Sequence, residues 1–194
     1  GRYKLSFGQG LVINNTLSFG KYAALSTLGR QNNGIRVYSS RSSINYLQGA
    51  AATIELAHNL DLTTFLSYRT IDATLTSNGD IKTILNTGYH RTAKEMERKD
   101  NASQFTTGGN LNWRCGRLTL GLTALFTHFD KALSPNTDLY YRRYAPSGND
   151  FWNVGINYSY MRKHWSLAGE TATSNGGTLA TINNISVQVK SNLS

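Results

Sequence analysis

Three tight turns constrain the fold of this chain most strongly, because polar and apolar residues alternate on both sides of each turn and stay in phase across it. The clearest turn is Cys115-Gly116. Folding the chain there matches these positions on one face: Trp113–Leu118, Leu111–Leu120, Gly109–Leu122, Thr107–Ala124 and Phe105–Phe126. The intervening residues, such as Asn110 and Thr123, fall on the other face. Side chains of a strand alternate between its faces with period two, so the segment predicts a β-hairpin with an apolar and a polar face.

The same construction recurs at two further turns. A turn at Arg162-Lys163 predicts the pairs Tyr160–Trp165, Tyr158–Leu167, Ile156–Gly169 and Val154–Thr171. A turn through residues 58–60 predicts the pairs Leu56–Leu62, Ile54–Thr64, Ala52–Leu66 and Ala50–Tyr68. Phe65 is an exception, since its place in the alternation puts an aromatic ring on the polar face.

Long polar connections join the hairpins, over residues 14–44, 74–103 and 130–149. Each hairpin arm has about ten residues, the length with which a tilted strand crosses a bilayer. Tight turns at one end and long loops at the other are typical of outer-membrane barrels. We therefore predict an all-β fold, an antiparallel up-and-down transmembrane β-barrel with about eight strands in this chain. The expected strands are 2–13, 45–57, 61–73, 104–114, 117–129, 150–161, 164–173 and 178–190.

Aromatic residues favour the same orientation. Trp113, Tyr160 and Trp165 lie close to the tight turns. The aromatic residues near the long loops are Tyr68, Phe105, Phe126 and Trp152. Rings of this kind settle at both membrane–water interfaces of a barrel. The alternative is a soluble sandwich or lipocalin-like barrel with an aromatic core, but loops this long and one-sided favour the membrane barrel.

Length, charge and the chain ends set further bounds. The 194 residues predict one domain, 1–194, which we expect to be a barrel region truncated at both ends, because no export signal or terminal aromatic residue is found. No run of eighteen apolar residues occurs, which excludes a membrane-spanning helix. The net charge of +9 comes from scattered residues, with groups at 91–99 and 142–143 in the expected external loops. We expect these loops to contact anionic lipopolysaccharide rather than nucleic acid, because basic and aromatic residues are not interleaved. The single Cys115 predicts no redox chemistry.

Several short stretches resemble the barrel region of outer-membrane proteins from Bacteroidetes-type bacteria that carry periplasmic helix-hairpin-helix modules ahead of the barrel. The matching stretches are Phe7–Val12, Gln48–Ala52, Ser67–Ala73, Gly88–Thr92 and Gly169-Glu170. The resemblance implies a barrel that continues beyond this chain in the outer membrane of a Gram-negative bacterium. It implies no enzymatic activity and no catalytic residues. Any role in DNA binding would belong to the modules, which are absent from these residues.

One loop segment has a local structure of its own. Thr92 followed by Glu95 forms the pattern of a capping box, which predicts a short helix over about residues 93–99. In one interpretation His90 is a general base or metal ligand with Glu95 or Glu97 nearby. In the other, which we prefer, His90 and Arg91 anchor the loop at the barrel mouth by hydrogen bonds, since general-base catalysis needs a positioned partner that the sequence does not show.

No other pattern predicts chemistry. The sequence lacks a nucleophile elbow, the spacing of a metal site and a glycine-rich phosphate loop, so we predict no catalytic residues, no metal and no cofactor. Gly8-Gln9-Gly10 is interpreted as part of the first strand. The inward positions form a separate group, a polar network of the barrel interior with the members Glu55, Arg69, Arg114, Glu170 and Lys190. Charges inside a barrel need water or opposite charges. Two arrangements fit this pattern: Arg69 near Glu55 or Glu170 forms a network that fills a narrow barrel, or the same groups line a polar pore, and the sequence does not decide between them.

Three functions remain open. The leading hypothesis is a structural or accessory, non-enzymatic component of an outer-membrane assembly, with lipid, lipopolysaccharide and other outer-membrane proteins as partners. The second is a porin-like pore or transporter for small solutes, which strand number would decide because eight strands leave room only for side chains. The third is a surface hydrolase that uses His90 with a loop carboxylate.

Overall fold

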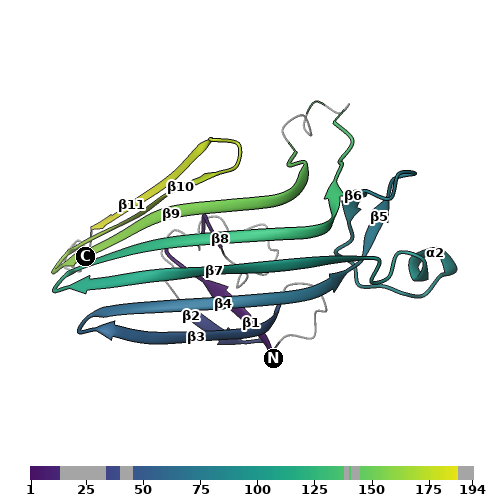
Figure 1. Ribbon diagram of the computed structural model, residues 1–194. Helices are drawn as coiled ribbons and strands as arrows, with labels where there is room; N and C mark the ends of the chain where they lie inside the picture. Colours follow the sequence, from purple (N-terminus) through teal and green to yellow (C-terminus); the bar gives the residue numbers. More distant parts are fainter. Residues whose placement is uncertain (14–33, 40–45, 138–139, 141–144, 188–194) are drawn as a thin grey trace, which may run out of the picture.

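The computed structural model describes residues 1–13, 34–39, 46–137, 140 and 145–187 (Figure 1). The chain is all-β, with one short helix in the described part. The strands are β1 (Arg2–Ser6), β2 (Gly34–Val37), β3 (Leu47–Ala57), β4 (Leu60–Ile71), β5 (Ala73–Leu75), β6 (Ile81–Ile84), β7 (Ala102–Cys115), β8 (Leu118–Leu133), β9 (Gly148–Arg162), β10 (Trp165–Ser174) and β11 (Leu179–Val187). The helix α2 spans Ala93–Met96.

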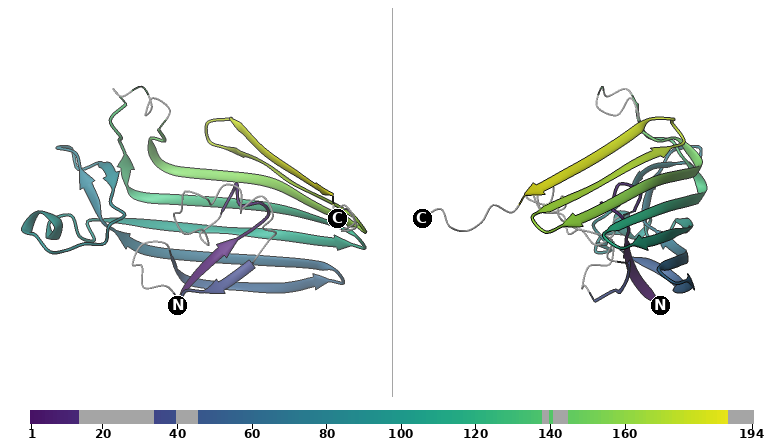
Figure 2. Two further views of the ribbon diagram at one scale, coloured as in Figure 1. Left: turned by 180° about the vertical axis from the view of Figure 1, so that it is seen from behind. Right: turned by 90° about the vertical axis from the view of Figure 1, so that its left-hand side faces the viewer.

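The strands form one curled antiparallel sheet with the shape of a half-barrel (Figure 2). Its order is β11-β10-β9-β8-β7-β4-β3-β1-β2, so that β11 and β2 are the edges of the described sheet. We call the long strands β3, β4 and β7–β11 the wall. The small strands β5 and β6 lie off this path, and β6 meets β8 in parallel at Ile81 and Leu133. Among the described residues, no helix is long and apolar enough to span a membrane.

The three predicted hairpins are present, but their predicted registers are wrong by two residues. Trp113 lies opposite Leu120, where Leu118 was expected, and Tyr160 lies opposite Leu167, where Trp165 was expected. In the hairpin at residues 58–60 the shift is two residues in the other direction, since Ile54 lies opposite Leu62, where Thr64 was expected. The turns are Gly116-Arg117, Lys163-His164 and His58-Asn59. The cause is backbone geometry, since the left-handed residues Gly116 (φ 58°), Lys163 (φ 39°) and Asn59 (φ 66°) determine where each chain reverses. In the third hairpin a bulge between Glu55 and Ala57 adjusts the pairing.

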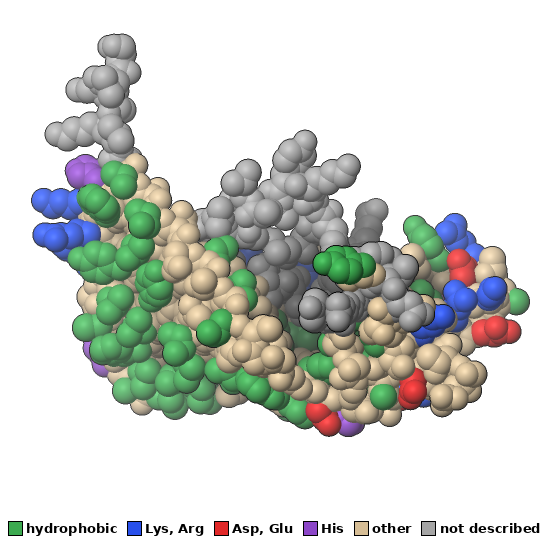
Figure 3. Space-filling view, turned by 90° about the horizontal axis from the view of Figure 1, so that it is seen from above, with side chains coloured by type: hydrophobic (Ala, Val, Ile, Leu, Met, Phe, Trp, Pro, Cys, Tyr) green, Lys and Arg blue, Asp and Glu red, His purple; other side chains and the backbone are tan. Residues whose placement is uncertain are grey.

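A shift of two residues leaves every side chain on its predicted face. On the outer, convex face Leu122 is 46% exposed, Ile156 59% and Ile185 63%. On the inner, concave face Asn110 and Glu170 are each 1% exposed. Figure 3 shows hydrophobic side chains gathered at the tight-turn end of the sheet and acidic side chains at the opposite end. The sheet therefore presents apolar side chains outward and buries several polar ones on its inner face, among them Asn110, Thr123 and Glu170.

The prediction of one strand over residues 2–13 is wrong. β1 ends at Ser6, and residues 8–12 form turns and bends. β1 pairs with β3 only through Arg2 and Tyr3, and then with β2, which lies in the predicted loop 14–44. From there the segment runs across the concave face (Figure 2). The two glycines of Gly8-Gln9-Gly10 have positive φ, a conformation that breaks a strand.

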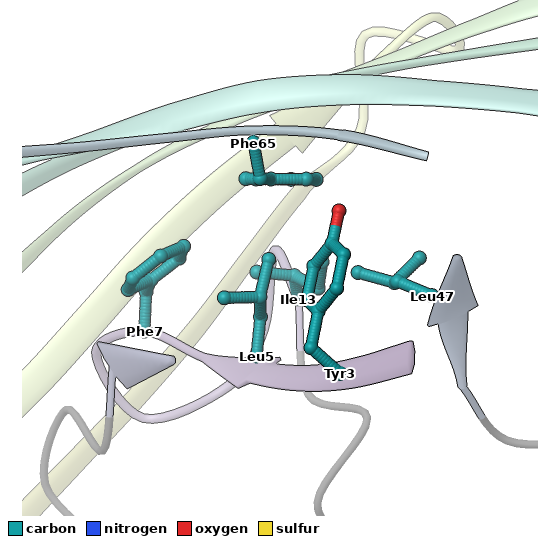
Figure 4. Packing of buried hydrophobic residues seen from close by; sticks show 6 residues of the cluster. All are labelled: Tyr3, Leu5, Phe7, Ile13, Leu47 and Phe65. Atoms are coloured by element: carbon teal, nitrogen blue, oxygen red, sulfur yellow. The ribbon is translucent and has the colours of Figure 1, made fainter. Parts of the chain in front are cut away.

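A hydrophobic cluster holds this first segment against the wall. Its members are Tyr3, Leu5, Phe7, Ile13, Leu47 and Phe65 (Figure 4). The ring centroids of Phe7 and Phe65 are 6.4 Å apart, within the range of interacting aromatic pairs. The aromatic ring that broke the alternation thus has an apolar partner inside the concavity.

The described parts of the connections 74–103 and 130–149 lie at the end opposite the tight turns (Figure 1). They carry more strand than predicted, because β6 and the last two residues of β5 lie within 74–103 and β8 runs on to Leu133. A second apolar cluster packs these elements together, with the members Ile71, Ala73, Ile81, Ala102 and Phe129. The predicted helix is confirmed over four of its expected residues as α2. The basic pair 142–143 and the end of the last expected strand lie outside the described residues.

Candidate functional site

A polar site with several buried hydrogen bonds lies on the concave face, where the first segment (residues 1–13) meets β9 and β10. The carboxylate of Glu170 on β10 accepts backbone N–H groups at both oxygens. Gln9 and Leu11 donate to Oε2 at 2.6 and 3.1 Å, and Val12 donates to Oε1 at 3.3 Å. Hydrogen bonds to a charged acceptor are each worth about 1.5–3 kcal/mol, more than bonds between neutral groups. Glu170 therefore ties the start of the chain to a strand near its other end.

Glycines make this approach possible on both sides of the contact. A Cβ on Gly8 would lie 2.9 Å from Oε2 of Glu170 and 2.8 Å from Cβ of Asn157. A Cβ on Gly155 of β9 would lie 2.5 Å from a methyl carbon of Val12. Each of these positions is closed to a larger side chain unless its neighbours move. The concave face is thus shaped to receive the turn at residues 8–12.

The other end of the first segment is fixed by Tyr3. Its hydroxyl donates to the backbone carbonyl of Leu66 on β4 at 2.6 Å. Tyr3 is 6% exposed and Leu5 is fully buried. The apolar side chains of the first segment, from Tyr3 to the turn that Glu170 binds, are therefore covered by the wall. The contact of this segment with the concave face was not predicted from the sequence, because residues 2–13 were assigned to the barrel wall. Two features of the sequence indicate the contact: the glycines of Gly8-Gln9-Gly10 and the inward position of Phe65.

The described members of the predicted interior network have separate partners. Among the described charges, Glu170 binds the first segment, and Arg114 pairs with Asp61 at 2.6 Å near the tight turns. Arg69 donates to Oε1 of Gln104 at 2.9 and 3.1 Å. Glu55 is exposed on β3, and Lys190 lies outside the described residues. These charges lie at different positions along the long strands of the wall. The alternation determines which face a residue occupies but not its position along the strand, so it does not show which inward charges meet.

Arg69 has further partners at the long-loop end. Its guanidinium donates to the backbone carbonyl of Tyr46 at 3.3 Å and lies 5.9 Å from the centre of that ring. Arg2 of β1 lies 4.4 Å from the same ring. Arg2 and Arg69 are therefore both within cation–π distance of the Tyr46 ring, which extends the contact of the first segment with the wall.

His90 is fixed by a different carboxylate from those considered in the sequence. Its Nε2 lies 2.7 Å from Oδ2 of Asp72, whose other oxygen accepts the N–H of Asp100 at 2.9 Å. His90, Asp72 and Arg69 border a cavity of about 150 Å³. This pair joins the loop to the end of β4, which is the anchoring arrangement expected for His90. A second pair, His128 with Asp150 at 2.7 Å, joins β8 and β9 nearby.

The capping box that starts α2 is confirmed in full. Oγ1 of Thr92 accepts the N–H of Glu95 at 3.2 Å, and Oε2 of Glu95 accepts the N–H groups of Arg91 and Thr92 at 2.8 and 3.1 Å. These backbone donors, that of Arg91 first, hold the pKa of Glu95 below its ordinary value. The Arg91 guanidinium lies 4.1 Å from the ring centre of Tyr89. The described residues hold no cluster of three His, Cys, Asp or Glu side chains suited to a metal ion.

The second notable surface is the apolar outer face, by which we mean the exposed apolar side chains of the wall. Its largest members are Leu66, Tyr68, Phe105, Trp113, Leu122, Phe126, Trp152, Ile156, Trp165, Ile185 and Val187. Trp113 and Trp165 lie near the tight turns, and Tyr68 and Trp152 near the long connections. No family model, no curated protein and no solved structure matches the chain.

Proposed function

We propose that this chain is the barrel region of an outer-membrane protein of a Gram-negative bacterium, with a structural or accessory role in an outer-membrane assembly. In this proposal the wall strands cross the bilayer, and the long connections form the external contact surface. The observation that carries the proposal is the apolar outer face on a sheet whose concave face covers polar side chains. The resemblance to barrels that follow helix-hairpin-helix modules belongs to the same proposal.

The physical argument concerns the solvent of the outer face. In water, apolar side chains gather inside a protein, and a contiguous exposed apolar patch marks an interaction surface. In a bilayer the distribution is reversed for a barrel, with apolar side chains outward and polar side chains inward. Asn110 and Thr123 are each 1% exposed, while their sequence neighbours Leu111 and Leu122 face outward. Lipid is the solvent that suits both faces at once.

The aromatic side chains supply a second argument. Trp113 and Trp165 are 45% and 60% exposed at one end of the wall, and Tyr68 and Trp152 are 58% and 42% exposed at the other. Two bands separated along the strands match the two interfaces of a bilayer. The proposal therefore gives each tryptophan an expected depth.

Tryptophan fluorescence tests the location. Purified protein is refolded into vesicles whose phospholipids carry bromine at a single depth of the acyl chain. We expect the strongest quenching from bromine near the headgroups, because the three tryptophans lie at the ends of the wall. Iodide in the aqueous phase is the control and should quench weakly. Strong iodide quenching with no effect of bromine would refute the membrane location.

Planar bilayers distinguish a structural barrel from a pore. The first segment lies on the concave face beside β4, β9 and β10, which supports a closed interior along these strands. We expect purified protein to insert without steady conductance. Reproducible single-channel steps would favour the pore instead.

His90 provides the test of the non-enzymatic role. Its bond to Asp72 supports an anchor, so His90→Ala should loosen the loop and leave any lipid or peptide cleavage in the preparation unchanged. Loss of a cleavage activity in His90→Ala, with an unchanged Arg91→Ala control, would favour the hydrolase.

A further inference from the structure

We propose that residues 1–13 form a resident plug of the concave interior, and that Glu170 is the latch that keeps this plug seated. The inference rests on the proposed function for its consequence in a membrane, but the contacts that carry it lie within the chain itself. It assigns a conformational role to a buried carboxylate and to a segment that does not belong to the barrel wall.

The latch is a single acidic side chain with a specific set of donors. Glu170 is 1% exposed, and its two oxygens accept three backbone N–H groups from residues 9–12. A carboxylate can only accept hydrogen bonds, so it suits a turn that directs successive N–H groups to one side. A neutral amide of the same shape offers one accepting oxygen and would keep part of the contact. An alanine would remove all of it.

The plug is seated, but it is not bonded at every polar atom. Oε1 of Gln9 and Oδ1 of Asn157 are buried and have no hydrogen-bond partner among the described residues. An unpaired buried polar atom favours the open state, in which water can reach it. The seated state therefore depends on Glu170 and on the apolar cluster around Phe7 and Phe65. Removing the latch should shift the population toward an unseated segment.

The glycines give an independent way to unseat the plug. Gly8 has φ +54°, and a Cβ there would lie 2.9 Å from the latch oxygen. Gly8→Ala should therefore weaken the seating while Glu170 is still present. Gly176 is the matched control, because a Cβ there would meet only the Thr178 hydroxyl at 3.9 Å.

A thiol-labelling experiment tests the latch. The exposed Cys115 is replaced by Ser, and Gln9→Cys supplies a buried reporter that keeps its backbone N–H. We expect slow reaction of the folded protein with a polar maleimide. Glu170→Ala should raise the rate at least about tenfold, because hydrogen bonds to a charged acceptor are lost, and Glu170→Gln should be intermediate. Glu55→Gln, an exposed glutamate on the same sheet, is the matched control and should leave the rate unchanged.

Equal rates in Glu170→Ala and Glu55→Gln would overturn the latch. The latch would also be overturned if the reporter protein with Glu170 intact reacted as fast in buffer as it does when unfolded in urea. If Glu170→Ala does not fold, Gly8→Ala against Gly176→Ala carries the same comparison. Hydrogen exchange of the unsubstituted protein adds a measurement without any variant. The amides of Gln9 and Val12 should be protected, and rapid exchange at both would overturn the plug.

The labelling needs only the folded chain, in detergent micelles or in buffer. A protein that fails to enter vesicles yet shows latch-dependent labelling would refute the membrane location and support the plug. A protein that enters vesicles and labels equally fast with and without Glu170 would support the location and refute the plug.

Discussion

At the scale of single residues, the ring of Phe65 lies on the polar concave face because it has an apolar partner there. That partner is Phe7, and both belong to the cluster around β1. The neighbouring Leu66 points the other way and is 50% exposed. Two adjacent side chains of β4 therefore have different environments, one inside the protein and one on its outer face.

We expect Phe65→Ala to lower the free energy of unfolding by about 3–5 kcal/mol, since it leaves a cavity between β4 and the first segment. Leu66→Ala is the control on the opposite face and should cost much less. Urea unfolding monitored by tryptophan fluorescence measures both. Equal losses in the two variants would contradict the packing of the cluster.

The individual charges were predictable only in part. The alternation placed Glu170 and Arg69 on the inner face, but it gave no information about which backbone or side-chain groups they meet. Glu170 binds a turn 158–161 residues away in the sequence, and Arg69 binds Gln104 on the next strand of the wall. Contacts of this kind depend on how the sheet curls, which a pattern of period two does not contain.

At the scale of elements, the hairpins were predictable because one local rule determines them. The alternation gave the correct faces of all three, yet the position of each turn depends on one residue with a positive φ angle rather than on hydrophobicity. The helix α2 was predictable for the same reason, since its capping box lies within four residues. The end of β1 at Ser6 was not predictable, because the apolar pattern of residues 2–13 fits a strand as well as a strand followed by a turn. The positive φ angles of Gly8 and Gly10 select the turn.

The capping box makes the start of α2 sensitive to acid. The pKa of Glu95 is lower in the folded loop than in an unfolded chain, so its stabilising effect is present above the ordinary glutamate pKa of about 4.3 and is lost as the pH falls through the folded value. We expect the amide signals of Arg91 and Thr92 to shift together over that acidic range. Glu95→Gln should abolish the shift, whereas Glu97→Gln should preserve it. If the amide signals still shift with pH in Glu95→Gln, another titrating group causes the shift.

At the scale of the whole molecule, the half-barrel combines an apolar outer face with an interior that its own first segment occupies. The outer face carries the proposed location, and the interior carries the proposed plug. These two features are separable, because the first depends on exposed residues of the wall and the second on buried contacts of residues 1–13.

A charge on the outer face tests the location in the intact protein. We expect Leu122→Arg to lower the stability of the lipid-embedded protein by about 2–4 kcal/mol, the cost measured for arginine near the middle of a bilayer. Thr83→Arg, at an exposed position of β6 beyond the wall, is the control and should have little effect. Reversible unfolding from vesicles measures the stability of both variants. An unchanged stability of Leu122→Arg would argue against lipid at this position.

The bonds between Glu170 and residues 9–12 also bear on the order of folding. They connect parts of the chain separated by about 160 residues, so closing this loop costs more entropy than forming any of the hairpins. Neighbouring strands can zip together before it closes, which makes this junction a late event on the pathway. Substitutions there should accelerate the disassembly of the native state and leave its rate of formation almost unchanged.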